Sequence, residues 1–276
     1  MPFTEALRLA LQAIWHSKLR SFFTLLGIIV SVAFLVMVVA IIQGMNAYVR
    51  ENITGALIGT NAFQVRRTPI NVGLMDDELI RAIAKRPLIT LRDAEVVRRA
   101  VPDAQAVALQ SGWPTPVSDV THRGRAVENA VVFGVTPPYQ VVQDYQFAAG
   151  APLADPDVRE RRDVVVLGHD VADRLFDEPA MAVGRKVRVA GRELQVKGVI
   201  GKKGRVLGQS FDTFVLLPFT TFESMYGRRK TTVVSVKMPT AEAIDPAMAR
   251  AEEAMRLAHR LRPGEPNDFT VDKATA

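Results

Sequence analysis

The residue types that most often carry chemistry are few and widely spaced in this 276-residue chain. Cysteine is absent, no two histidines form an H-x-x-x-H pair, and no serine stands in a G-x-S-x-G turn. The histidines stand far apart in the sequence, as His16, His122, His169 and His259. A zinc site needs several such ligands at short spacings. We therefore expect neither a metal site nor a catalytic residue.

The glycine-rich stretch at 198–204 reads GVIGKKG. A phosphate-binding loop has the spacing G-x-x-x-x-G-K-[ST], which lets backbone N–H groups surround the phosphates. The spacing here differs, so we expect this chain to bind no nucleotide and no other cofactor. The formal net charge is +6, but both signs are spread along the chain. The basic block that is typical of nucleic-acid binding is missing, so we expect no nucleic-acid partner.

Two groups of polar side chains remain as candidates for contacts with a partner. Lys202, Lys203 and Arg205 lie in the glycine-rich loop 201–208. They form either a flexible, solvated loop or a contact surface, because charged loops on a rigid scaffold often bind other molecules. For the clustered carboxylates at 76–78 we expect an ordinary solvated loop. Trp113 packs either in the core or on a surface that meets a substrate or partner.

The elements that must position these residues begin with an apolar segment. Residues 22–42 read FFTLLGIIVSVAFLVMVVAII, 21 residues without a charge. At about 1.5 Å per residue this helix spans roughly 30 Å, the thickness of the bilayer's hydrocarbon core. No cleavage pattern follows it, so we expect a retained transmembrane helix. Lys18 and Arg20 precede the span, and the first basic residue after it is Arg50, which predicts a cytoplasmic N-terminus.

Two further features lie ahead of this span and within it. Ahead of it, Leu7, Leu11, Ile14 and Trp15 share one helical face. This pattern predicts a helix in the membrane interface, the alternative being a simple extension of the span. Within the span, Gly27 and Ser31 form a small-x-x-x-small pair, which lets another helix approach closely. We therefore predict an interfacial helix at 1–20, a transmembrane helix at 21–49 and an extracytoplasmic domain at 50–276.

Beyond the membrane the pattern alternates between strands and helices. Thr90 is a plausible N-cap for a helix that ends at Ala100, with Asp93 at the third helical position. Other helices are expected at 169–176, 220–226 and 246–261, and a hairpin around 122–125. Strands are expected at 62–66, 104–109, 126–135, 163–167, 186–189, 193–200, 214–217, 233–237 and 269–271. No regular βαβ repeat appears, so the expected class is α+β.

Six stretches follow one another in an order that has a counterpart in a known family. They are KLRS at 18–21 with TLLGII at 24–29, GTN at 59–61, GVT at 134–136 with Gly150, VVVLG at 164–168 with RLF at 174–176, the segment from VG at 183–184 to GV at 198–199, and loop 201–208 with VLLP at 215–218. This order resembles the MacB-type family of ABC permeases, including its lipoprotein-releasing relatives.

The resemblance implies one membrane helix, a periplasmic domain of two lobes (porter-like and a smaller α+β insertion) and three further membrane helices. The sequence ends at Ala276, so we expect either a piece of a longer permease or one whose remaining helices were lost. The resemblance also implies a bacterial inner-membrane location and a mixed set of partners. These are a cytoplasmic ABC-type ATP-binding subunit that binds ATP and Mg²⁺, a second permease copy, the lipid bilayer and a periplasmic membrane-fusion adaptor.

The function implied is that of a non-catalytic permease subunit. Such a subunit couples cytoplasmic ATP hydrolysis to periplasmic conformational change, for efflux or for lipoprotein or peptide export. On this interpretation Lys202, Lys203 and Arg205 would contact the adaptor or the second permease. The alternative is a single-pass receptor or anchored scaffold whose outer domain binds a ligand without transport.

Overall fold

The computed structural model describes residues 18–69, 77–112, 115–203, 205–206, 209–210, 212–227 and 231–273. The chain divides into two compact units, Met1–Arg50 and Glu51–Ala276. The interfacial helix predicted ahead of the span falls largely within residues 1–17, and Trp113 stands at a gap in these ranges. Both predictions therefore lie outside the described residues.

A single long helix, α2, runs over Lys18–Ile58. Its segment Lys18–Gly44 is long and apolar enough to cross a membrane, and an 18-residue window within it has a mean hydropathy of 3.2 and no buried residue. Large apolar side chains such as Phe34 and Ile41 are instead exposed along it. A helix that is apolar all round and unburied needs lipid or other helices around it. This candidate membrane helix lies where the sequence predicts one.

The domain that follows has an α/β lobe built on a sheet in the order β2–β12–β1–β13. Its strands are β1 (Ala62–Arg66), β2 (Ala106–Ser111), β12 (Thr232–Lys237) and β13 (Thr270–Lys273). Its helices are α3 (Asp77–Lys85), α4 (Leu91–Ala100), the short 3₁₀ helix η1 (Ala241–Ala243) and α10 (Ile244–Ala258). The capping predicted for α4 is present, because the N–H of Thr90 donates to the Asp93 carboxylate at 2.7 Å.

Between β2 and β12 the chain builds a second lobe, which we call the barrel lobe. Strands β11, β6, β8, β7, β3 and β4 pair in that order, and β11 also pairs with β4, so the ring closes. These strands are β3 (Val117–His122), β4 (Arg125–Val135), β6 (Val164–Leu167), β7 (Lys186–Val189), β8 (Arg192–Ile200) and β11 (Phe214–Pro218). Closing the ring leaves these strands with no free sheet edge along the paired residues.

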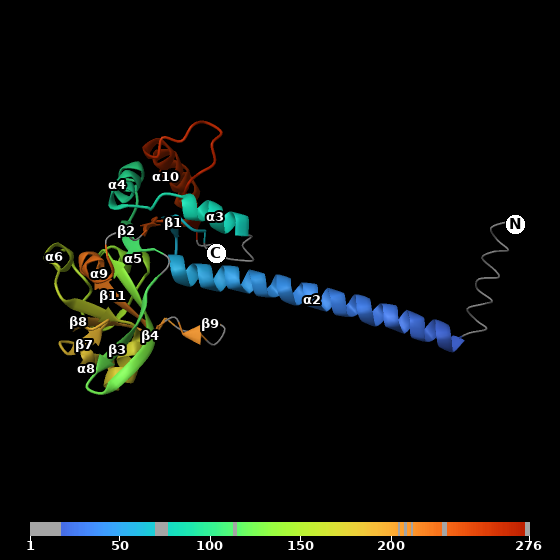
Figure 1. Ribbon diagram of the computed structural model, residues 1–276, viewed down its shortest axis with the longest axis horizontal. Coiled ribbons are helices and arrows are strands. Elements are labelled where there is room, and N and C mark those ends of the chain that lie inside the picture. Colours follow the sequence, from blue (N-terminus) through green and yellow to red (C-terminus); the bar gives the residue numbers. More distant parts are fainter. Residues whose placement is uncertain are drawn as a thin grey trace. The chain divides into compact units, whose positions relative to one another are not determined.

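Short elements complete the barrel lobe. Strand β5 (Phe147–Gly150) pairs with β8, and β9 (Arg205–Val206) with β10 (Gln209–Ser210) makes a separate hairpin. The helices are α5 (Tyr139–Val142), α6 (Asp155–Arg159), α7 (His169–Phe176), α8 (Pro179–Ala182) and α9 (Phe219–Tyr226). In Figure 1, α4 and α10 lie at one end of the domain and β3, β7 and α8 at the other.

Each lobe has its own hydrophobic core. In the α/β lobe, Phe63 and Val236 of the sheet pack with Val97 of α4 and Met255 of α10. In the barrel lobe, strand side chains such as Val165 pack with helical side chains from α7 and α9. A single registered pair, Gln110 opposite Val135, joins β2 to β4 between the lobes. The predicted fold, one membrane-length helix followed by a mixed α/β domain, is confirmed.

Two expectations about local structure need correction. Asp77 and Glu78 do not lie in a loop but begin helix α3, where acidic residues are favourable beside the positive end of the helix dipole. Asp76 lies outside the described residues. The hairpin at 122–125 joins β4 to β3, a strand that we did not expect. Its pattern VSDVTH is largely polar because only Val120 of this strand is buried.

Candidate functional site at the start of the domain

The chain enters the domain through a close contact just after α2. Gly59 has a φ of +92°, and a Cβ there would lie 2.1 Å from the backbone oxygen of Val142 at the end of α5. Only glycine fits both the backbone conformation and the space. Two residues later, the carbonyl oxygen of Asn61 accepts a hydrogen bond from the N–H of Met238 at 2.8 Å. The first residues beyond the helix are thus held by both lobes.

Asp144 lies at the centre of this junction. Its carboxylate accepts a hydrogen bond from the Thr60 hydroxyl and forms an ion pair with Lys237 of β12. Thr60 and Lys237 belong to the α/β lobe, whereas Asp144 follows α5 in the barrel lobe. Burial alone would raise the pKa of Asp144, but the bonds from Lys237 and Thr60 together outweigh it, so this pKa lies below its ordinary value. We call Gly59, Thr60, Asp144, Lys203 and Lys237 the junction site.

Lys203 joins the junction site from the glycine-rich loop. Its N–H donates to Asp212 at 3.0 Å, and its ammonium donates to Gln143 at 3.1 Å. The ammonium also lies 4.5 Å from the centre of the Tyr145 ring, a cation–π contact. Burial lowers the pKa of Lys203 to about 8, although Asp144 and Asp212 act in the opposite direction.

The three basic residues predicted to contact a partner therefore have different surroundings. Lys202 and Lys203 are both exposed, but Lys203 also bonds within the domain, and Arg205 begins strand β9. The Arg205 side chain lies outside the described residues. A partner contact at Lys202, Lys203 and Arg205 stays a prediction, and Lys203 in addition bonds to Gln143 and Asp212 beside the junction.

The predicted helix-packing pair lies on α2. The Ser31 hydroxyl donates to the carbonyl oxygen of Gly27 at 2.7 Å, so its polar atom is satisfied within its own helix. Nothing lies within 4 Å of the place where a Cβ on Gly27 would stand. The pair thus presents a shallow surface without an exposed unpaired hydroxyl, which suits close helix packing. No contact with a second helix tests this prediction.

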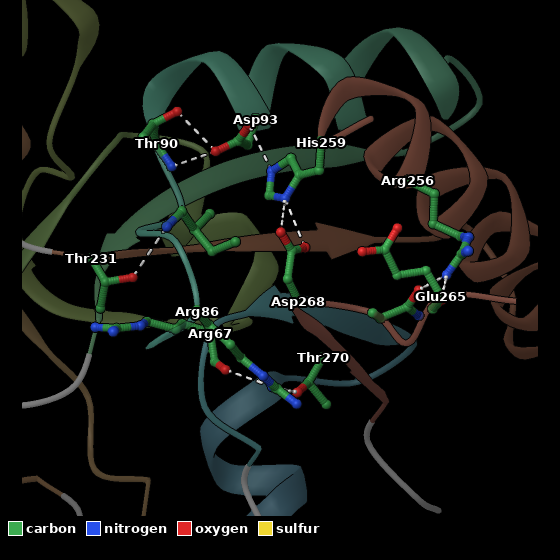
Figure 2. Close-up of polar contacts among 12 residues, drawn as sticks. Arg67, Arg86, Thr90, Asp93, Thr231, Arg256, His259, Glu265, Asp268 and Thr270 are labelled. Carbon is green, nitrogen blue, oxygen red and sulfur yellow. Dashed lines mark hydrogen bonds and ion pairs between the residues drawn. The ribbon is translucent and has the colours of Figure 1, made fainter. Parts of the chain in front are cut away.

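One histidine has partners that its sequence position does not reveal. The Nδ1 atom of His259 lies 2.8 Å from the Asp268 carboxylate, and its Nε2 atom lies 3.4 Å from Asp93 of α4 (Figure 2). The His259 side chain is 10% exposed. These contacts join the end of α10 to α4 and to the segment before β13. Within the described ranges no group of three or more His, Asp or Glu side chains is placed to hold a metal ion.

Sequence reasoning did not find the junction site as a unit. Thr60 is 84 positions from Asp144, and Lys237 is 93 positions from it. Spacing carries no signal at such separations. A weak local signal exists at Asp144, whose φ of +53° is a conformation that Asp adopts more readily than most residues.

Comparison with known proteins assigns the chain to a family. The sequence profile of the MacB-like periplasmic core domain matches residues 21–254, which includes most of α2 and nearly all of the domain. The chain belongs to this family.

Named relatives are considerably longer. The chain is 30% identical over 237 residues to the "Macrolide export ATP-binding/permease protein MacB" of Neisseria gonorrhoeae, covering 86% of this chain and 34% of that protein. It is 32% identical over 263 residues to the "Macrolide export ATP-binding/permease protein MacB 1/2" of Paracoccus denitrificans, covering 93% of this chain and 36% of that protein. The chain therefore spans little more than a third of these relatives.

Solved structures show the same fold at low identity. The periplasmic region of MacB from Actinobacillus actinomycetemcomitans matches with a TM-score of 0.61 at 18% identity, covering 81% of this chain and 92% of that one. The extracellular domain of the transporter YknZ from Gram-positive bacteria matches with a TM-score of 0.57 at 17% identity, covering 76% and 99%. The domain that follows α2 thus has the same fold as these two extracytoplasmic domains.

Proposed function

We propose that this chain is the N-terminal part of a non-catalytic ABC permease subunit that passes movement from the membrane to an extracytoplasmic domain. The observation that carries the proposal is the unbroken helix α2, which runs from the apolar span to within one residue of Gly59. Membership in the MacB-like family supports a permease role. Directly after the end of the helix, the junction site supplies polar contacts between the two lobes.

The length of α2 suits such a connection. Its 41 residues make a helix of about 60 Å at 1.5 Å per residue. The bilayer core accounts for about 30 Å of this. The 16 residues from Gln43 to Ile58 would extend about 24 Å beyond the apolar run. A continuous helix transmits displacement because its backbone hydrogen bonds run from one end to the other.

The proposal places ATP and Mg²⁺ on a separate ABC-type ATP-binding subunit. It also includes a second permease copy, the lipid bilayer and an adaptor protein outside the membrane. Lys18 and Arg20 before the span favour a cytoplasmic N-terminus in a bacterial inner membrane. The domain would then lie in the periplasm, and its movement would serve efflux or lipoprotein or peptide export.

A helix-breaking insertion tests the connection. Gly-Pro-Gly-Pro would be inserted after Gly44 in the complex with the ATP-binding subunit, and the same four residues after Gly264 would serve as the matched control. A spin label at Arg174→Cys on α7 would report the distance between two copies, since the chain has no native cysteine.

We expect ATP with vanadate to change this distance in the parent and in the Gly264 control. The Gly44 insertion should abolish that change while basal ATP hydrolysis continues. An unaltered ATP-driven distance change in the Gly44 variant would contradict the proposed rigid connection.

A further inference from the structure

The two faces of the β2–β12–β1–β13 sheet differ in chemistry. The face packed against α4 and α10 is apolar, with Phe63, Val107 and Val234 in one core. The other face is set by the register of the same strands. On it, Gln64 stands opposite Ser235 and Arg66 stands opposite Thr270. We call this second face the polar face.

Several polar atoms on the polar face are buried without compensation. Ser235 is 0% exposed and Gln110 is 6% exposed. The Ser235 hydroxyl, the Gln110 amide oxygen and the Nε atom of Arg66 have no hydrogen-bond partner among the described residues. Burial also lowers the pKa of Arg66, against the effects of Asp272 and Tyr139. Burying polar groups without partners costs stability, so an apolar face would hold the lobes together more firmly.

The polar face meets the barrel lobe through small side chains. Ala62, Ala106 and Ala108 on the sheet pack with Tyr139 and Val142 of α5. Small side chains interdigitate little, so they leave a smoother contact than leucine or phenylalanine would.

The backbone connection across this contact is narrow. The ladder between β2 and β4 has the one registered pair Gln110 and Val135. Beside this pair, Thr136 and Leu109 exchange hydrogen bonds and the N–H of Gly134 donates to the Ser111 hydroxyl, so the connection is confined to three neighbouring residues on each strand end. The ion pair of Lys237 with Asp144 adds a side-chain tie. Lys237 is buried, but Asp144 is 47% exposed, so solvent screens the pair and it contributes little to holding the two lobes rigidly.

A groove opens along the edge of the contact and leaves room for displacement. Its volume is about 690 Å³. Val101 and Ala106 line it from the α/β lobe, and Pro138, Val141 and Leu153 line it from the barrel lobe. A change in the angle between the lobes would widen or narrow this groove and shift Ala62, Ala106 and Ala108 against the barrel lobe, while the separate core of each lobe stays intact.

We propose that the polar face is a sliding contact, across which the α/β lobe and the barrel lobe shift against each other. This inference rests on the proposed function, because it supplies the movement that α2 would drive. The contact keeps polar atoms that weaken it, as expected where function requires mobility at some expense of stability.

The test makes the polar face apolar and measures the motion. The double variant Ser235→Ala, Gln110→Met removes the two orphan groups with little change in volume. Thr121→Val on β3 is a matched polar-to-apolar control outside the contact. Spin labels at Arg92→Cys on α4 and Arg174→Cys on α7, both exposed, would report the distance between the lobes. The whole chain would be measured in lipid nanodiscs without any ATP-binding subunit.

We expect a broad or two-peaked distance distribution in the parent and in Thr121→Val. The double variant should give one narrower peak and a melting temperature higher by about 2–4 °C. Asp144→Asn, which removes a tie between the lobes, should broaden the parent's distribution and serves as a second test if the double variant fails to fold.

A single narrow peak in the parent that neither variant alters would overturn the inference. The measurement needs no ATP. A chain that shows lobe motion but binds no ATP-binding subunit would therefore refute the permease proposal and leave the sliding contact supported.

Discussion

At the scale of single residues, the junction site concentrates polar contacts between the two lobes, directly after the end of α2. Gly59 permits the close approach to α5, and Asp144 receives both Thr60 and Lys237. Thr60 and Lys237 come from different segments of the α/β lobe, and both contact the Asp144 carboxylate. The charge of Asp144 therefore makes a small but specific contribution to the junction.

The pH dependence of stability should reveal this carboxylate. The pKa of Asp144 is lowered in the folded domain. Its contribution is therefore present above the unfolded value of about 3.9 and is lost as the pH falls through the folded value. The Asp144 side chain is 47% exposed. Because solvent screens such a pair, we expect Asp144→Asn to lower the free energy of unfolding by only about 0.5–1 kcal/mol at pH 7.

Urea unfolding followed by circular dichroism at pH 7, 5 and 3 would measure this difference. The gap between the parent and Asp144→Asn should close toward pH 3. Glu253→Gln, at an exposed carboxylate on α10, is the control and should change little at any pH. A gap that persists unchanged at pH 3 would show that Asp144 acts through its shape and not through its charge.

At the scale of elements, the α/β lobe depends on polar ties between its helices as well as on its core. His259 at the end of α10 lies between Asp93 of α4 and Asp268 before β13 (Figure 2). The two carboxylates are 10% and 25% exposed. Removing the imidazole would leave both without this partner in a largely buried place.

We therefore expect His259→Phe to destabilise the domain by about 2–3 kcal/mol. Chemical unfolding of the purified chain in detergent would measure the loss. His169→Gln, at the start of α7 in the other lobe, is the matched control and should cost under about 1 kcal/mol. Equal losses in the two variants would mean that the contacts of His259 contribute nothing specific.

Helix α2 makes a prediction of its own. Gly27→Leu fills the shallow surface next to Ser31 and should weaken association of α2 with another helix by about tenfold. A bacterial two-hybrid reporter that carries the membrane segment would measure this association. Ala33→Leu adds three carbons on another, exposed part of the helix and should have little effect. Loss of association in both variants would remove the special role of the Gly27 surface.

Elements with an unbroken local pattern could be predicted from the sequence. The uncharged run of α2, the buried strand β6 with α7, and the β7–β8 hairpin around Ala190 and Gly191 all appear where expected. Strand β3 was missed because it lies in the wall of the barrel with most of its own side chains outside the core, so its sequence lacks an apolar pattern. The junction site was missed because its partners come from segments that meet only after both lobes have folded.

At the scale of the whole molecule, the chain leaves the α/β lobe after β2 and returns to it with β12. The last strand closes the lobe beside the first, since Lys273 of β13 stands opposite Phe63 of β1. The strand that follows α2 therefore pairs with the last two strands of the chain, β12 and β13. Movement of α2 would act first on the centre of that sheet.

The most direct test of the central claim is affinity purification of the chain from its native membranes, with mass spectrometry of what accompanies it. We predict that an ABC-type ATP-binding protein is recovered at about one copy per copy of this chain and that the purified complex hydrolyses ATP. Recovery of the chain without any ABC-type ATP-binding protein, under detergent conditions that preserve a known complex of the family, would contradict the permease role and favour an anchored receptor or scaffold.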